Sequence, residues 1–239
     1  IEDGEAFQQN VLNPLIAPVA NYLDTLVTGL YTQVTQYQGT PGTKPTDLTY
    51  YLNAGAMLDD FACPRDGQRS AILSPWSQAS LVQGLKGLFH SADQIQRQYE
   101  EGTMGLAAGL KFSMDQNIKT HTTGTFGTST PAMAATSSDG ATTLNISGWA
   151  SGASQLKKGD IISVAGCYAV NPVSKTSTGQ LQQFVVTADT SDSSGAMATL
   201  PISPAVNLTG PNQNVTAVPT SGAAVYVYGL QNNTYSNKA

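Results

Sequence analysis

Apolar side chains recur every three or four residues along the first part of the chain. This spacing predicts an amphipathic helix over residues 5–36, about 45 Å long at a rise of about 1.5 Å per residue. Pro14 and Pro18 lie within the pattern, and because each lacks a backbone N–H we predict a bend there. The pattern fits an ordinary buried helix and also a spine that other elements and subunits share. Its apolar positions are Val11, Leu12, Leu15, Ile16, Val19, Leu23, Leu26, Val27, Leu30, Tyr31 and Val34.

Shorter helical and extended patterns follow as far as residue 124. A loop rich in Gly and Pro at 38–46 precedes a second predicted helix, with Thr46 as its N-cap. A strand at about 69–73 leads into a third helix, with Ser74 as N-cap and Pro75 as first residue. Residues 110–123 alternate in the manner of strands. The apolar faces of the two helices are Leu48, Tyr51, Leu52 and Leu58, and then Trp76, Ala79, Val82, Leu85, Leu88 and Phe89.

The pattern changes between residues 125 and 230, where helical periodicity is absent. Short β-favouring runs alternate with turn signals, which predicts a small antiparallel barrel or sandwich. The runs are TTLNIS, IISVA, QFVVT, MATLPI and AVYVY. The turn signals are Asp139-Gly140, Gly159-Asp160, Thr178-Gly179, Ser194-Gly195 and Gly210-Pro211-Asn212.

The distribution of charge predicts a domain boundary, and the net charge argues against nucleic acid as a tightly bound partner. Charged residues are only 11% of the 239 residues, so the surface is polar but nearly neutral, which suits contact with other proteins. The net charge of −5 argues against tight nucleic-acid binding. Residues 1–124 hold twelve acidic and seven basic side chains, whereas residues 125–239 hold four of each, which predicts a domain boundary near Gly124. With no membrane-length apolar run and no signal peptide, we expect a soluble intracellular protein.

Candidate nucleophiles and bases are few. Cys63 and Cys167 have no metal-type spacing and are too few for a disulfide framework, so we predict two free thiols. His90 and His121 are predicted to be hydrogen-bonded surface or packing residues. An enzyme that pairs Cys63 with either histidine stays conceivable, provided that the side chains lie within hydrogen-bond reach.

Other short motifs carry no chemistry that we can assign. The carboxylate pairs Asp59-Asp60 and Glu100-Glu101 are predicted to be a solvated helix end and a charged loop rim, because adjacent helical residues do not share a face. The glycine-rich stretch at 102–109 lacks the spacing of a phosphate-binding loop and is expected to be a flexible surface loop. We therefore predict no catalytic, cofactor-binding or metal-ligating residue, and no cofactor. Matches to N-x-S/T, expected by chance in this composition, occur at Asn145, Asn207, Asn214 and Asn232.

Several segments, taken in order, resemble one known family. The run from Ile1-Glu2-Asp3 into the first helix looks like the entry to the spine helix of tailed-bacteriophage major capsid proteins. The resemblance is to the short-tailed-phage branch, whose coat protein carries an inserted β domain. The matching segments are CPRDGQRSAILSP at 63–75, GLKGLFHSADQIQRQYEEGTMG at 84–105, FSMDQNIKTHTTG at 112–124, and LKKGDIISVAGCYAVNP at 156–172 followed by QFVVT.

The resemblance implies an α+β tailed-phage/herpesvirus-type capsid fold. It would place the spine helix of the peripheral domain at 1–45, the axial domain at 46–124, an inserted β-barrel domain at 125–230 and a return segment to the axial domain at 231–239. The family's N-terminal arm, its extended loop and the strands after the insertion are missing, so we expect a chain truncated at both ends.

The implied function is that of a structural virion subunit rather than an enzyme. Such a coat protein assembles in the bacterial cytoplasm into hexameric and pentameric capsomers of an icosahedral shell around double-stranded DNA. The expected partners are further copies of the chain, a scaffolding protein and a portal, with at most weak DNA contact and no membrane. The alternative is a bacterial surface adhesin or carbohydrate-binding module, suggested by the Ser/Thr/Asn-rich β half.

Overall fold

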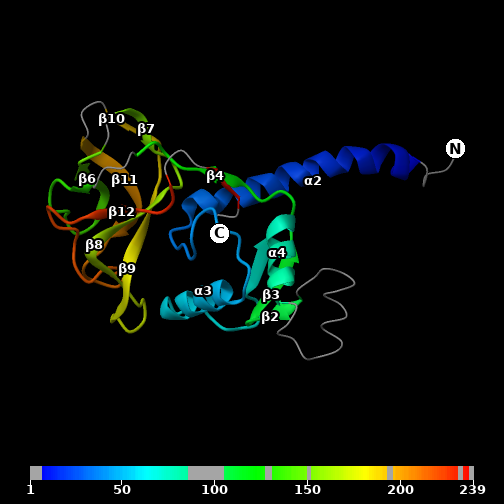
Figure 1. The fold of residues 1–239 in the computed structure, drawn as a ribbon, viewed down its shortest axis with the longest axis horizontal. Coiled ribbons are helices and arrows are strands. Elements are labelled where there is room, and N and C mark those ends of the chain that lie inside the picture. The colour runs from blue at the N-terminus through cyan, green and yellow to red at the C-terminus, as the bar shows by residue number, and fades with distance from the viewer. Residues whose placement is uncertain are drawn as a thin grey trace.

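The structure is a computed structural model that describes residues 7–85, 105–126, 131–149, 152–192, 196–230 and 234–236. The fold is mixed α+β, with a helix that extends away from two packed units (Figure 1). We call them the α/β unit, at 48–85 and 105–114, and the β unit, formed by the described residues of 131–230. Within the described ranges, none of the helices combines the length and apolar content that a membrane span requires.

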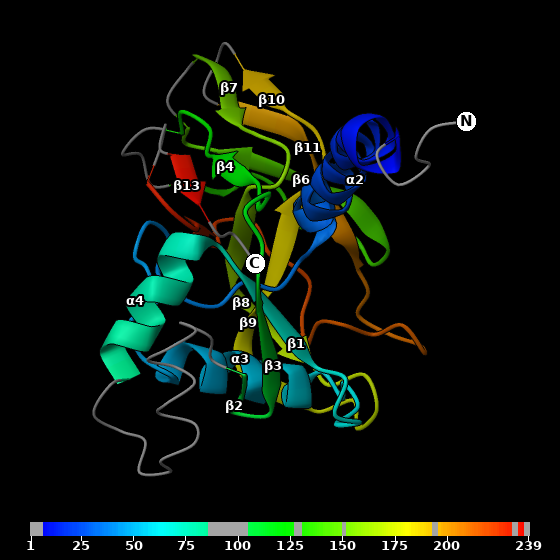
Figure 2. The same ribbon diagram turned by 90° about the vertical axis from the view of Figure 1, so that its right-hand side faces the viewer.

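The N-terminal helix is α-helical over a shorter stretch than residues 5–36. The backbone N–H of Asn13 donates to the Gln8 carbonyl in the π-helical pattern, just ahead of Pro14, which has no N–H to continue an α-helical ladder. No residue of the helical segments is buried, so the helix is not a core helix of this chain. Figure 1 shows its N-terminal end standing clear of the sheets, and Figure 2 views the helix nearly end-on. The segments are η1 (Gln8–Leu12), α2 (Asn13–Thr28) and η2 (Gly29–Gln33).

The α/β unit packs two helices against a three-stranded sheet. The strand order is β1-β3-β2, with β1 parallel and β2 antiparallel to β3. The strand before Ser74 and the helix after it are both as predicted, and the Ser74 hydroxyl accepts a hydrogen bond from the Ser77 backbone N–H. The small core consists of Leu73, Leu81, Leu110 and Phe112. The elements are α3 (Thr49–Asp60), β1 (Ser70–Leu73), α4 (Pro75–Leu85), β2 (Leu106–Ala107) and β3 (Leu110–Met114).

Two predictions in this unit are wrong. The N-cap of α3 is Leu48 and not Thr46, and the Asp47 carboxylate just before it accepts a hydrogen bond from the Thr49 backbone N–H at 2.7 Å. The described part of the glycine-rich stretch is a tight hairpin between β2 and β3 rather than a flexible loop. Ala108 and Gly109 both have positive φ there, at 50° and 74°, as a short hairpin turn requires.

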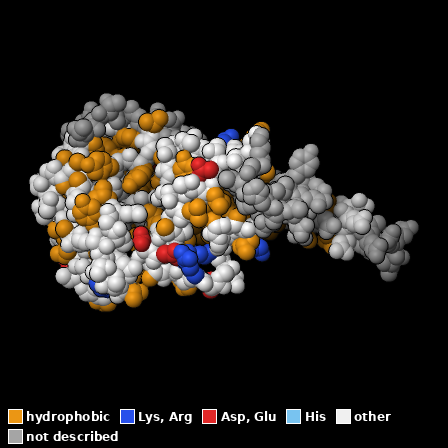
Figure 3. Space-filling view, turned by 60° about the horizontal axis from the view of Figure 1, so that its bottom comes forward, with side chains coloured by type: hydrophobic (Ala, Val, Ile, Leu, Met, Phe, Trp, Pro, Cys, Tyr) orange, Lys and Arg blue, Asp and Glu red, His pale blue; other side chains and the backbone are white. Residues whose placement is uncertain are grey.

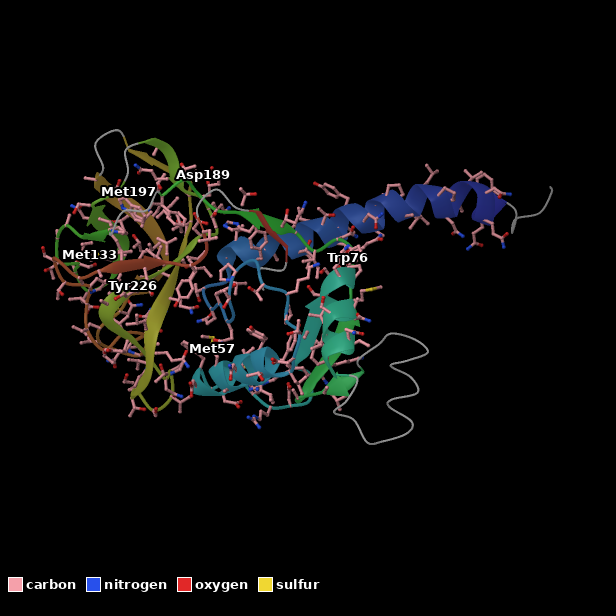
Figure 4. The ribbon with its side chains drawn as sticks, viewed as in Figure 1. Met57, Trp76, Met133, Asp189, Met197 and Tyr226 are labelled. Carbon is pink, nitrogen blue, oxygen red and sulfur yellow. The ribbon has the colours of Figure 1, made fainter. Side chains whose placement is uncertain are left out.

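The β unit is a six-stranded antiparallel sheet that nearly closes on itself, as predicted for a small barrel. The strand order is β12-β8-β9-β11-β6-β5. Ala132 of β5 bridges to Ala224 beside β12, so the two sheet edges meet. Met133 and Met197 lie inside the unit (Figure 4). The strands are β5 (Ala132–Met133), β6 (Ala141–Ser147), β7 (Gly152–Leu156), β8 (Ile161–Val170), β9 (Ser177–Val186), β10 (Thr190–Asp192), β11 (Ala196–Val206) and β12 (Val225–Val227).

Local patterns missed two features of this unit. The β7–β10 ribbon has no counterpart among the predicted strands. The predicted turn at Thr178-Gly179 lies inside β9, and the chain turns instead at residues 172–174. The Asn171 side chain holds that turn, because its carboxamide oxygen accepts hydrogen bonds from the backbone N–H groups of Val173 and Ser174.

A narrow ribbon of two strands connects the β unit to the rest of the chain. It consists of β4 (Thr120–Thr122) and β13 (Thr234–Ser236), which pair in antiparallel fashion with His121 opposite Tyr235. The Thr123 hydroxyl also donates to the Leu230 carbonyl at 2.5 Å. The chain therefore enters and leaves the β unit at neighbouring points.

Candidate functional site

The structure brings together three polar side chains that are far apart in the sequence. His121 lies on β4, Asp160 lies in the turn before β8, and Tyr31 lies in η2 at the end of the long helix. The Nε2 atom of His121 is 2.7 Å from Asp160 Oδ1, and its Nδ1 atom is 3.1 Å from the Tyr31 hydroxyl. The Tyr31 and His121 rings meet edge to face with centroids 5.6 Å apart. We call these three residues the junction cluster.

Asp160 is the centre of charge in the junction cluster. Its side chain is completely buried, and its second oxygen accepts from the backbone N–H groups of Lys157, at 2.8 Å, and Gly124, at 3.1 Å. The two backbone N–H groups are donors that stabilise a carboxylate. These bonds compensate the desolvation of a buried anion.

The partner groups determine how His121 is protonated. Because the Asp160 carboxylate only accepts, Nε2 must carry a proton, and in the neutral ring Nδ1 then accepts from the Tyr31 hydroxyl. Burial, together with the Asp160 charge, raises the pKa of Tyr31, so this hydroxyl keeps its proton at neutral pH. The result is a relay of hydrogen bonds from the helix, through β4, into the β unit.

Two glycines permit the close approach on which this relay depends. Gly159 has φ +95°, and a Cβ there would lie 3.2 Å from His121 Cε1 and 3.1 Å from Thr32 Cγ2. A Cβ on Gly124 would lie 2.2 Å from the Gln155 carbonyl oxygen. Their sequence signals were only a turn and a composition boundary, so the junction cluster itself was not predicted.

Two further hydrogen-bonded contacts join the β unit to the remainder of the chain. The Gln183 carboxamide forms a pair of hydrogen bonds with the backbone of Tyr37, accepting from its N–H and donating to its carbonyl at 2.9 Å. The Asn171 carboxamide donates to the Asp60 carbonyl at the end of α3, at 2.6 Å. A hollow of about 470 Å³ lies between the linker at 37–40, the start of α3 and the β unit. The β unit therefore contacts both the linker and the end of α3.

Among the described residues, the remaining candidates do not form a site with one another. Both cysteines are free, as predicted, and burial raises the pKa of the Cys167 thiol to about 12, which makes it unreactive. Both ring nitrogens of His121 face Asp160 and Tyr31, so this ring is not placed to activate Cys63. His90 and Glu100-Glu101 lie outside the described residues.

The Asp59-Asp60 pair is part of a helix end. Hydrogen bonds from Arg65 and then Arg69 hold the pKa of the Asp59 carboxyl well below its usual range. Within the part of the chain that the structure describes, no three His, Cys, Asp or Glu side chains gather as metal ligands would.

The N-x-S/T asparagines that the structure describes belong to strands and turns. Asn145 lies in β6, and Asn214 accepts from the Asn207 backbone N–H while donating to the Ala205 carbonyl. Asn232 lies outside the described residues.

Exposed apolar side chains gather on the long helix. Their exposed fractions run from 40% to 64%, an unusual surface for a helix in water. Trp76 at the start of α4 is 74% exposed, with Lys44 Nζ 5.3 Å from its ring centroid. Figure 3 shows that charged atoms are sparse on a face where apolar and neutral polar atoms mix. The fractions of 40% to 64% refer to the exposed aliphatic residues of the helix, which are Val11, Leu12, Leu15, Ile16, Val19, Leu23, Leu26, Val27 and Leu30.

Comparisons with known proteins point to viral coat proteins. The family model described as P22 coat protein, gene protein 5, matches residues 30–237. Among solved structures, the CUS-3 coat protein I-domain is similar at 23% sequence identity and a TM-score of 0.31, over 42% of this chain and 96% of that chain. A search of curated proteins finds no match.

Proposed function

The chain belongs to the P22 coat protein family, and from this we propose that it is a structural subunit of a bacteriophage capsid, which self-assembles into an icosahedral shell around double-stranded DNA. The observation that carries the proposal is the family match over residues 30–237, which is most of the chain. The family is one of coat proteins, so the role is structural rather than enzymatic.

The surface chemistry supports this proposal. A row of apolar side chains along a helix with no buried residue is expected to be covered by other protein surface. The low charged fraction suits a subunit that meets neighbours on several sides, and the net charge of −5 suits a shell wall with only weak DNA contact.

We assign the parts of the chain by their resemblance to the family. Residues 1–45 are the spine helix of the peripheral domain, 46–124 the axial domain, 125–230 the inserted β-barrel domain and 231–239 the return segment. The subunit forms hexameric and pentameric capsomers in the bacterial cytoplasm, with a scaffolding protein and a portal as partners, and then resides in the virion.

Co-expression of the gene product that contains this chain with its scaffolding protein tests the proposal. Closed shells are expected by negative-stain microscopy. Val19→Glu combined with Leu23→Glu should abolish them, because it places two charges on the apolar helix face, whereas the control Gln9→Glu should leave them intact. A stable monomer under all these conditions, or shells from the double variant, would contradict the proposed role of this face.

The adhesin or carbohydrate-binding alternative gains no support from these comparisons. The enzyme alternative is weakened by the contacts of His121, which tie its ring to Asp160 and Tyr31.

A further inference from the structure

The α/β unit and the β unit have separate hydrophobic cores. One core cluster lies within residues 133–225, and the other consists of Leu73, Leu81, Leu110 and Phe112. No side chain belongs to both clusters. Each unit can therefore keep its own packing while its orientation relative to the other changes.

The covalent connection between the units has the form of a hinge. The chain passes to and from the β unit through the β4–β13 ribbon, where three residue pairs are in register and Thr123 bonds to Leu230. Two adjacent strands can twist together, so a small change in their backbone angles would turn the whole β unit.

The junction cluster closes this hinge because its middle residue sits on the ribbon itself. His121 of β4 bonds on one side to Asp160 of the β unit and on the other to Tyr31 of the long helix. The helix is itself tied to the segment before β4, since Thr28 donates to the Asn117 carbonyl at 3.0 Å and Asn117 donates to Asp24 at 2.7 Å. Twisting of the ribbon therefore breaks at least one hydrogen bond of the cluster.

The other contacts between the units leave room for movement. The Gln183–Tyr37 and Asn171–Asp60 hydrogen bonds exchange with water at modest net cost. The hollow of about 470 Å³ separates the linker and the start of α3 from the β unit. Figure 4 shows Met57 on the side of α3 that faces the β unit, where a small cavity is lined by Met57, Phe61, Ala169 and Leu181.

We propose that the junction cluster is a latch, which holds the β unit in one orientation on the long helix, and that the β4–β13 ribbon is the hinge about which the unit turns when the latch opens. Tyr31 and His121 act as positioning residues for the β unit rather than as parts of its core. The proposal rests on contacts within one chain and is independent of the proposed function.

Distance measurements between two spin labels test this proposal. The labels are placed on the 239-residue chain at Ala20→Cys, on the exposed side of the helix, and at Val173→Cys, at the exposed tip of the β8–β9 hairpin. Cys63→Ser removes the accessible thiol, while the buried Cys167 stays unlabelled. A large excess of unlabelled chain suppresses distances between different copies.

Tyr31→Phe and His121→Asn each open the latch while leaving the β-unit core untouched. Both should broaden and shift the distance distribution, whereas Tyr22→Phe, the same chemical change at an exposed tyrosine of the same helix, should not. In His121→Asn, amide exchange at Gly124 and Lys157 should become about tenfold faster. Fluorescence of the buried Trp149, recorded in a Trp76→Phe background, should keep its thermal transition.

Two results would overturn the latch. One is a distance distribution in Tyr31→Phe and His121→Asn that matches the Tyr22→Phe control. The other is loss of the Trp149 transition in both variants, which would make the cluster part of the β-unit core.

Discussion

Asp160 illustrates how one side chain can determine the conformation of several segments. Its two oxygens bind the His121 ring and the backbone N–H groups of Lys157 and Gly124, so a turn, a strand and the entry to the β unit converge on one carboxylate. A buried anion with three donors contributes far more than an exposed one, because removing any partner leaves charge that water cannot reach.

Asp160→Asn should lower the free energy of unfolding of the β unit by about 2–4 kcal/mol. The NH₂ group of asparagine would replace one carboxylate oxygen and would face a hydrogen-bond donor that then has no acceptor. Urea denaturation followed by Trp149 fluorescence measures this effect. The control is Asp189→Asn, an exposed carboxylate with a single bond to the Lys158 backbone N–H, for which about 1 kcal/mol or less is expected. Equal losses in the two variants would show that burial of Asp160 contributes nothing.

Asp59 should remain ionised in acid at pH values where an ordinary aspartate is protonated. Hydrogen bonds from Arg65 and Arg69 lower its pKa in the folded chain, so the associated stabilisation is complete above the ordinary aspartate range and is lost as the pH falls through the lowered folded value. A carboxyl NMR titration from neutral to strongly acid pH measures the shift. Arg65→Met should move the Asp59 titration back toward its ordinary range. An unchanged titration curve would show that Arg65 is not the main cause of the lowered pKa.

At the scale of elements, local sequence patterns predicted several of the helices and strands whose apolar face meets a core, but not β7, which contributes Leu156 to the core of the β unit. The strand before Ser74, the helix after it and the long strands β8, β9 and β11 follow from apolar spacing and turn residues. The two-residue strands β2 and β5 were not predictable in this way, because a pairing partner rather than an apolar pattern defines them.

The junction cluster could not be predicted from local sequence patterns, for a related reason. His121 and Asp160 are 39 residues apart, and Tyr31 is 90 residues from His121. Each residue carried only its local signal, which was a polar strand, a turn and a helix face. Three-dimensional proximity of these segments creates the site, and a single sequence contains no local trace of it.

Two helical glycines should respond in opposite ways to the same substitution. A Cβ on Gly84 of α4 would lie 1.6 Å from the Thr46 carbonyl oxygen, whereas a Cβ on Gly55 of α3 would meet nothing within 4 Å. Gly84→Ala should therefore destabilise the α/β unit and displace the loop before α3, while Gly55→Ala should stabilise it by about 0.5–1 kcal/mol through helix propensity. Thermal unfolding by circular dichroism compares the two, and stabilisation by Gly84→Ala would refute the close approach of α4 to Thr46.

At the scale of the whole molecule, the cores divide the chain into parts that can respond separately. The β unit has the larger core and a sheet whose edges nearly meet, whereas four buried side chains form the core of the α/β unit. The long helix belongs to neither core, since none of its residues is buried. Stability is therefore expected to be unequal along the chain, with the β unit the last to unfold.

Separate cores predict separate unfolding transitions, and each tryptophan reports on one unit. Leu200→Ala in the β unit should lower the transition seen by Trp149 by about 2–5 kcal/mol, and Leu81→Ala in the α/β unit should lower the transition seen by Trp76 by a similar amount, because each removes buried apolar volume. Each variant should leave the other transition within about 0.5 kcal/mol of its original value, since distant sites without shared partners are additive. Denaturation of single-tryptophan chains measures both. If either variant moved both transitions together, the two clusters would be one cooperative core, and the β unit could not turn on its ribbon as a rigid body.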